Sequence, residues 1–211
     1  ADYLGQELKQ LGLEVWEDTA AQSLGGNSGN LYAFWKGTKE GDPLLFSMHM
    51  DTVAPAGGKQ AVVHEDGRIT SNGDTVLGAD DMAGMAAMLE ALRCILEEGR
   101  EHRDIELLIS VGEELHLLGS GVFEYGRLKA KESYVLDLSG EVGTAACQAP
   151  SLASFTVKIM GKSSHAGFAP EKGVHAVAIG ARAVNRISIG RIGEDMTVNI
   201  GSIQGGTTTN V

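Results

Sequence analysis

Three segments of the chain are almost continuously apolar: residues 42–50 (DPLLFSMHM), 105–111 (IELLISV) and 133–138 (SYVLDL). Runs of this length and composition are typical of central strands that are covered on both faces. Two shorter segments, residues 13–18 (LEVWED) and 30–37 (NLYAFWKG), also predict strands. The chain therefore offers several strands for one sheet.

Helical patterns lie between these strands. Apolar residues recur at helical spacing over residues 2–12 and 78–99, and a short helix is expected around 120–129. Residues 61–73 predict a β-hairpin that turns at Asp66-Gly67. Alternating strands and helices predict an α/β fold with a mostly parallel sheet flanked by helices.

The pattern changes near residues 147–152. Residues 153–161 (ASFTVKIMG) alternate apolar with polar positions, which predicts an antiparallel strand with one wet face. Residues 175–187 predict a helix and residues 196–206 a further strand. We therefore expect an α/β domain over 1–147 and the start of an α+β domain over 148–211.

The composition of the chain indicates which binding partners and which cellular compartment to expect. The formal net charge is −11, which disfavours nucleic acid and anionic membrane surfaces as partners. No apolar stretch approaches the length of a membrane span. Two cysteines are too few for a disulfide framework and fit a reducing, cytoplasmic setting.

Acids and one histidine follow the three apolar runs. Ligands of open α/β sheets bind beyond the carboxyl ends of the strands, so these side chains are expected to converge. One imidazole with several carboxylates suits zinc, with manganese or cobalt as substitutes. The set comprises His49 with Asp51, Glu113 with Glu114, Asp137, and the pair Asp80-Asp81 at the start of a helix.

Each of these signals has an ordinary explanation when it is taken alone. An Asp-Asp pair at a helix start is usually an N-cap, and a Glu-Glu pair after a strand is usually a solvated turn. A histidine at a strand end is more often a hydrogen-bonded structural residue than a ligand. Their joint occurrence at strand ends of one α/β unit favours a metal site.

Four segments, HMDTV, GADDMAG, GEELHLLGSG and VLDLSG, occur in this order. They resemble the signature segments of the M20 family of di-zinc metallopeptidases, and most closely the peptidase T-like, or tripeptidase-like, subgroup. GKSSHAGFAPEKGVHA and NIGSIQGGTTTNV resemble parts of the family's inserted lid, or dimerisation, domain. The resemblance thus implies a catalytic di-metal domain over 1–147 and a lid domain from 148.

The resemblance also implies the metal ligands. His49 is expected to bind one zinc and Asp80 to bridge two zinc ions. Asp137 is expected to complete the site of His49, and Glu114 to bind the second zinc. A cis peptide bond is expected between Asp80 and Asp81.

Other residues are implied as catalytic. Asp51 is expected to accept the second N–H of His49 and to fix its tautomer. Glu113 is the expected general base. His165 is expected to stabilise the oxyanion in the active site of a partner subunit, which implies a homodimer formed through the lid, and Asn210 is expected to contact substrate.

Two positions depart from the family pattern. His116 stands where family members carry a small residue, often glycine, and an imidazole there is expected to crowd or to bind the second metal. Met82 replaces the lysine that commonly follows the Asp-Asp pair.

The family chain returns from the lid to the catalytic domain, and this return supplies a histidine to the second zinc. No histidine follows His175 in this chain, which ends at Val211. We therefore expect a chain truncated within the lid, inactive by itself, whose complete parent is a tripeptide aminopeptidase acting on short peptides. The alternatives are an M20-type carboxypeptidase, an N-acyl-amino-acid deacylase, or a non-catalytic metal-binding dimerisation fragment.

Overall fold

The computed structural model describes residues 1–208, and the chain divides into two compact units between Ala145 and Ala146. Within the described residues, the first unit contains one five-stranded sheet in the order β1-β2-β6-β3-β7. The strands are β1 (Glu14–Glu17), β2 (Leu31–Trp35), β3 (Leu44–His49), β6 (Ile105–Ser110) and β7 (Glu132–Val135).

The sheet is mixed. β1 pairs with β2, and β2 with β6, in antiparallel fashion, whereas β3 runs parallel to both of its neighbours, β6 and β7. The three parallel strands are the three apolar runs of the sequence, so they end at the same edge of the sheet. The predicted α/β fold with a sheet flanked by helices is confirmed, but the sheet is not mostly parallel: two of its strand pairings are parallel and two are antiparallel.

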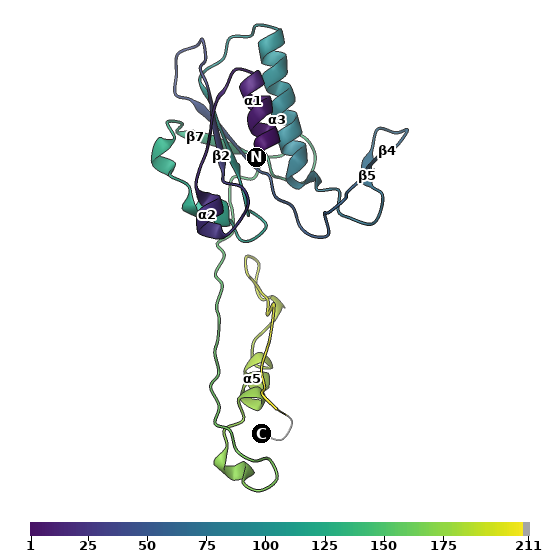
Figure 1. The fold of residues 1–211 in the computed structure, drawn as a ribbon, viewed down its shortest axis with the longest axis vertical. Coiled ribbons are helices and arrows are strands. Elements are labelled where there is room, and N and C mark those ends of the chain that lie inside the picture. The colour runs from purple at the N-terminus through teal and green to yellow at the C-terminus, as the bar shows by residue number, and fades with distance from the viewer. Residues whose placement is uncertain (209–211) are drawn as a thin grey trace. The chain divides into compact units, whose positions relative to one another are not determined.

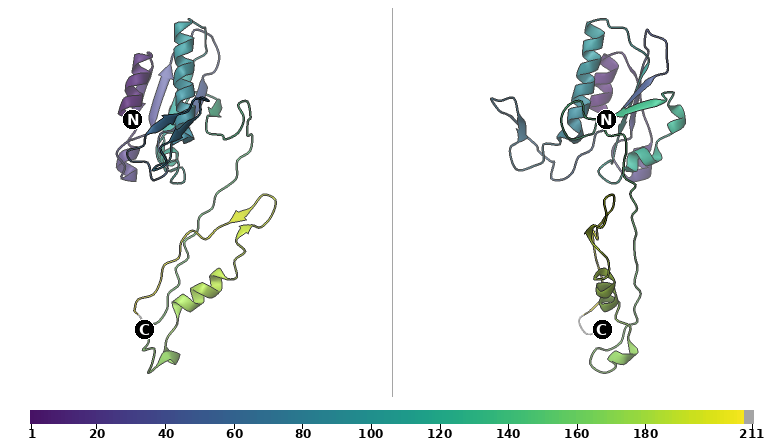
Figure 2. Two further views of the ribbon diagram at one scale, coloured as in Figure 1. Left: turned by 90° about the vertical axis from the view of Figure 1, so that its right-hand side faces the viewer. Right: turned by 180° about the vertical axis from the view of Figure 1, so that it is seen from behind.

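Two helices, α1 (Asp2–Gln10) and α3 (Ala79–Glu97), lie side by side on one face of the sheet (Figures 1 and 2). An ion pair of 2.6 Å between Glu7 and Arg93 joins them. The alternate residues of the strands that face these helices form the main core with Leu8, Met85, Met88 and Leu92. Burial of these apolar side chains holds the layer together.

The opposite face of the sheet is covered by the segment between β6 and β7. This segment contains α4 (Leu118–Val122) and the short 3-10 helix η1 (Tyr125–Arg127). Phe123 packs with Leu45 and Leu108 in a second, smaller core. Because both faces of the central strands β3 and β6 are covered, these strands are mostly apolar, as the sequence predicts.

Glu106 is a charged exception inside β6. Its side chain is fully buried (0% exposed) and its carboxylate accepts hydrogen bonds from Tyr32 Oη (2.8 Å) and from the backbone N–H groups of Lys129 (3.0 Å) and Ala130 (2.7 Å). Burial of a carboxylate is tolerated only when donors replace water. Glu106 thereby ties the segment that leads into β7 to the centre of the sheet.

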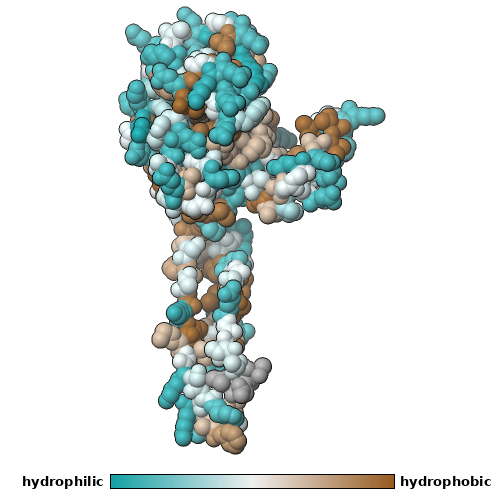
Figure 3. Space-filling view, in the orientation of Figure 1, coloured by the Kyte–Doolittle hydropathy of each residue, from teal (hydrophilic) through white to brown (hydrophobic). Residues whose placement is uncertain are grey.

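The hairpin predicted over 61–73 is present as β4 (Ala61–Val63) and β5 (Ile69–Ser71). Gly67 has φ +83° in the turn, and its N–H donates to the carbonyl of His64. Val63 and Ile69 are exposed, and Figure 3 shows apolar atoms at this hairpin. A short helix, α2 (Ala20–Leu24), connects β1 to β2.

The second unit contains η2 (Pro170–Lys172), α5 (Ala176–Val184), β8 (Gly190–Arg191) and β9 (Thr197–Val198). The helix predicted over 175–187 is confirmed, with the His175 ring accepting a hydrogen bond at its N-terminus.

Two strand predictions in the second unit are wrong in extent. Residues 153–161 form no strand within the described chain, and Phe155 is 87% exposed. Of residues 196–206 only Thr197–Val198 are a strand. Alternation of apolar and polar positions describes a strand's faces, but a strand also needs a neighbour to take its backbone hydrogen bonds.

Among the described residues, no helix combines the length and the apolar character that crossing a lipid bilayer requires.

We expect Glu106→Ala to lower the free energy of unfolding by about 3 kcal/mol, because it leaves three part-buried donors without their acceptor. Tyr32→Phe removes only one of the donors and is expected to cost about 1 kcal/mol. Urea unfolding of both variants measures the difference. Equal costs for the two substitutions would contradict the role given to the Glu106 carboxylate.

Candidate metal centre

The candidate metal centre lies where the three parallel strands end. His49 is the last residue of β3 and is in register with Ser110, the last residue of β6. Asp137 follows the end of β7, held by a hydrogen bond of 3.0 Å from Leu136 N to Ser47 O. Glu113 follows β6. Neighbouring parallel strands thus bring together residues that are far apart in the sequence, as predicted.

His49 is the centre of this group and is 1% exposed. Its Nε2 lies 2.9 Å from Asp80 Oδ1, 3.7 Å from Asp137 Oδ2 and 3.8 Å from Glu113 Oε2. One ligand atom each of His49, Asp80 and Asp137 lie within 4.8 Å of one another. The structure therefore brings together three of the four predicted metal ligands, with Glu113 beside them.

Asp51 contacts both the His49 ring and the backbone of Glu113 and Glu114. Its backbone carbonyl lies 3.0 Å from His49 Nδ1, and its carboxylate Oδ1 is 3.5 Å from the same nitrogen. The carboxylate also accepts the N–H groups of Glu113 (3.0 Å) and Glu114 (3.1 Å). The sequence predicts only a contact between the Asp51 carboxylate and the His49 ring. In the structure the shorter contact with the ring comes from the Asp51 backbone carbonyl, and the carboxylate holds the backbone of Glu113 and Glu114.

Asp81 supports the backbone of His49 in the metal centre, a role that the sequence does not reveal. Its side chain is 3% exposed, and Oδ2 accepts the N–H of His49 at 3.3 Å. The Asp80-Asp81 peptide bond is cis, which confirms that expectation. A Cβ on Gly84 would lie 2.3 Å from both Asp81 Oδ1 and the carbonyl of Leu136, so the GADDMAG motif needs glycine there.

The pKa values of the centre reflect crowded negative charge. Burial lowers the pKa of His49, but the hydrogen bond to Asp80 and the charges of Asp137, Asp51 and Glu113 outweigh it, and the net shift is upward. Burial, followed by the hydrogen bond with Asp80, raises the pKa of Asp137 from 3.8 to about 6. Burial also raises the pKa of Asp81.

The carbonyl of Asp51 and the carboxylate of Asp80 both present oxygen atoms to the imidazole ring of His49. A divalent cation bound at Nε2 of His49 would offset the repulsion between the carboxylates around it. One imidazole nitrogen and carboxylate oxygens are a donor set that zinc accepts, and manganese and cobalt bind similar sets. The residues therefore fit a metal ion.

The remaining predicted site residues are Glu114, His165 and Asn210. Glu114 bonds to Asp51 through its backbone, and it is not one of the three residues whose ligand atoms converge. His165 belongs to the second unit, where its Nδ1 accepts the N–H groups of Gly167 and Phe168. Asn210 lies outside the described residues. The roles of all three stay predictions.

The loop that follows β6 has an unusual backbone. His116 and Leu117 both have left-handed conformations, with φ +65° and +61°. Residues with a Cβ adopt this conformation at a cost, whereas glycine does not. The structure thus gives a backbone reason why glycine suits position 116. The His116 side chain is exposed and is not part of the metal cluster.

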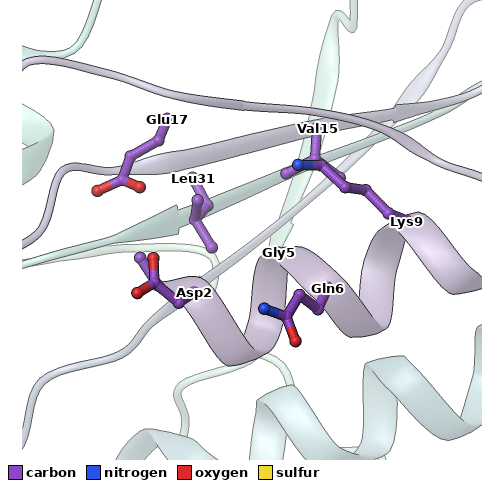
Figure 4. A pocket seen from close by; sticks show the side chains of 8 residues that line it. Asp2, Gly5, Gln6, Lys9, Val15, Glu17 and Leu31 are labelled. Atoms are coloured by element: carbon purple, nitrogen blue, oxygen red, sulfur yellow. The ribbon is translucent and has the colours of Figure 1, made fainter.

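A surface cleft of about 180 Å³ lies between α1 and β1 (Figure 4). It is lined by residues that include Gln6, Lys9, Val15 and Leu31. None of its lining residues belongs to the metal centre, so we assign it no part in the chemistry.

Sequence comparisons agree with this geometry. The profile of peptidase family M28 matches residues 30–166, and that of the M20 peptidase dimerisation domain matches residues 149–211. The uncharacterized protein YqjE of Bacillus subtilis (strain 168) is 43% identical over 208 residues, which are 99% of this chain and 56% of YqjE.

Two solved structures are similar over the same extent. The aminopeptidase PepT of Bacillus cereus ATCC 10987 is 40% identical with a TM-score of 0.76, and a tripeptidase of Staphylococcus aureus is 39% identical with a TM-score of 0.83. Each match covers 99% of this chain and 56% of the other chain. The chain therefore spans little more than half the length of these relatives.

The M28 profile covers the segments of the metal centre, and the dimerisation-domain profile covers the second unit. Together they place the chain among the M20/M28-type metallopeptidases. Within this class it belongs to the peptidase T-like family. The resemblance read from the four sequence motifs is thereby confirmed.

The raised pKa of Asp137 makes the stability of the metal-free protein depend on pH. Its neutral form is favoured in the folded chain, so its contribution is complete below about pH 4 and is lost as the pH rises through about 6. We expect the free energy of unfolding of the metal-free protein, relative to Asp137→Asn, to fall across this window. Chemical denaturation at several pH values measures it; parallel curves for both proteins would contradict the assignment.

We expect His116→Gly to raise the free energy of unfolding by about 1 kcal/mol, because glycine adopts φ +65° without strain. Leu115→Gly is the matched control: it alters a neighbouring exposed residue without a left-handed backbone, and it is expected to lower stability. Thermal or urea unfolding compares the two. A loss of stability in both variants would rule out strain at position 116.

Proposed function

We propose that the protein hydrolyses peptide bonds in short peptides as a tripeptidase-type aminopeptidase. The observation that carries the proposal is the cluster of His49, Asp80 and Asp137 with Glu113 at 3.8 Å from the imidazole. The names of the similar solved structures, a tripeptidase and an aminopeptidase, support the substrate class.

In the proposed mechanism His49, Asp80 and Asp137 would hold one metal ion, and Asp80 and Glu114 would hold a second. We propose zinc in both positions, with manganese or cobalt as substitutes. The bound ions supply Lewis acidity and lower the pKa of water. The family resemblance also implies a histidine as a further ligand of the second metal ion.

Glu113 is the proposed general base. It accepts a proton from the attacking water and delivers it to the leaving amine of the cleaved peptide. Its backbone N–H is fixed by Asp51, which also orients His49, so base and ligand share one support. We propose that this common support sets the distance between the base and the bound substrate carbonyl.

The second unit is proposed to join two protomers, because it matches the profile of a peptidase dimerisation domain. We propose that His165 of one protomer stabilises the oxyanion in the partner's active site, and that Asn210 contacts substrate. Both cysteines are free thiols, which supports the proposed cytoplasmic location.

We expect Glu113→Gln in the full-length protein to retain its metal and to lower turnover roughly 100- to 10,000-fold, the range for removal of a general base. Elemental analysis measures the metal, and hydrolysis of a free tripeptide measures turnover. Glu97→Gln, on the exposed side of α3, is the control and should change neither.

N-blocked and C-blocked tripeptides complete the experiment. An aminopeptidase cleaves the C-blocked but not the N-blocked peptide, whereas the opposite preference would indicate a carboxypeptidase. Loss of metal with unchanged turnover in Glu113→Gln would overturn the role of Glu113.

A further inference from the structure

A buried asparagine closes the base of the loop that carries Glu113 and Glu114. Asn30 directly precedes β2 and is 0% exposed. Its Oδ1 accepts the N–H of Val111 at 3.0 Å, and its Nδ2 donates to the carbonyl of Gly119 at 2.9 Å. Val111 and Gly119 are the residues directly before and after loop 112–118. One amide side chain thus binds both ends of this loop.

The two ends of the loop also bond to each other. The N–H of Gly119 donates to the carbonyl of Val111 at 2.9 Å, which completes a ring of hydrogen bonds with Asn30. A Cβ on Gly119 would lie 2.0 Å from that carbonyl and 2.5 Å from Asn30 Oδ1. The ring is therefore closed tightly enough to require glycine at position 119.

Asp18 fixes the orientation of the amide. Its Oδ2 accepts the second hydrogen of Asn30 Nδ2 at 2.7 Å, and its Oδ1 accepts the backbone N–H groups of Asn30 (2.8 Å) and Ala20 (2.9 Å). Both amide hydrogens and the amide oxygen of Asn30 are thus engaged, and only one orientation of the amide satisfies all partners.

We propose that Asn30 is a positioning residue for the metal centre. Its amide fixes the base of loop 112–118, and the carboxylate of Asp51 fixes the N–H groups of Glu113 and Glu114 within the same loop. With both attachments in place, the two glutamates have a defined backbone position relative to His49. The roles of these glutamates rest on the proposed function; the attachment of the loop does not.

The first test is hydrogen exchange in the metal-free protein. Asn30→Ala removes the hydrogen bonds to Val111 and Gly119, so the amides of Glu113 and Glu114 should exchange at least ~10-fold faster, while those of α3 keep their rates. Leu8→Ala, which alters the core without any hydrogen bond to the loop, is the control and should not accelerate these amides selectively. Unchanged exchange at Glu113 and Glu114 in Asn30→Ala would overturn the proposal.

The second test is Co²⁺ titration followed by visible absorption, a readout of ligand geometry. Asn30→Ala should weaken Co²⁺ binding roughly 10- to 100-fold and alter the spectrum, the range seen when residues that orient ligands are removed. Leu8→Ala should bind Co²⁺ as the unchanged protein does. Equal affinity and an identical spectrum in Asn30→Ala would show that Asn30 has only a structural role.

A third variant serves if Asn30→Ala does not fold. Asn30→Ser keeps a hydroxyl that can donate to Asp18 but is too short to reach both Val111 and Gly119, so it must show the same local loss of protection and weaker Co²⁺ binding. Absence of peptide hydrolysis by the unchanged protein would overturn the proposed function, but it would leave the exchange and Co²⁺ results as independent tests of Asn30.

Discussion

Repulsion between carboxylates around one buried imidazole is the constraint on which the site depends. The acids near His49 divide into two groups by what they bind. Asp51 and Asp81 accept backbone N–H groups, so peptide dipoles balance their charge. Asp80 and Asp137 instead face each other and the imidazole, and burial together with the neighbouring Asp80 raises the pKa of Asp137. The first group supports the site, and the second provides the oxygens that a cation would bind.

The sheet makes this gathering of charge possible. The central strands β3 and β6 are covered on both faces by apolar residues, β7 lies at the edge of the sheet, and the carboxyl ends of all three strands lie at the same end of the sheet. The charged groups are therefore confined to loops, while the strands that carry these loops are fixed by the core. Glu106 shows the same rule at a different place, because its buried carboxylate is also surrounded by donors from the backbone and from Tyr32.

Much of this arrangement was predictable from the sequence. The apolar runs predict the central strands, and the acids that follow them predict the convergence of His49, Asp80 and Asp137. The supporting contacts were not predictable, because Asn30 and Asp81 carry no pattern in the sequence that shows their partners. Asn30 reaches Val111 and Gly119 only after the chain has folded. The strand over 153–161 failed for a related reason, since its alternation does not specify a neighbour.

The pairing of His49 with Ser110 in adjacent parallel strands also determines what happens when β3 pairs in the wrong register. Successive side chains of a strand point to opposite faces, so a slip of β3 by one residue would turn the His49 ring away from its carboxylates. The same slip would turn Met48 out of the core. The apolar residues of β3 therefore disfavour the wrong register. A chain that mispairs loses its core contacts as well as its metal site, so the mispaired fold is less stable than the native one.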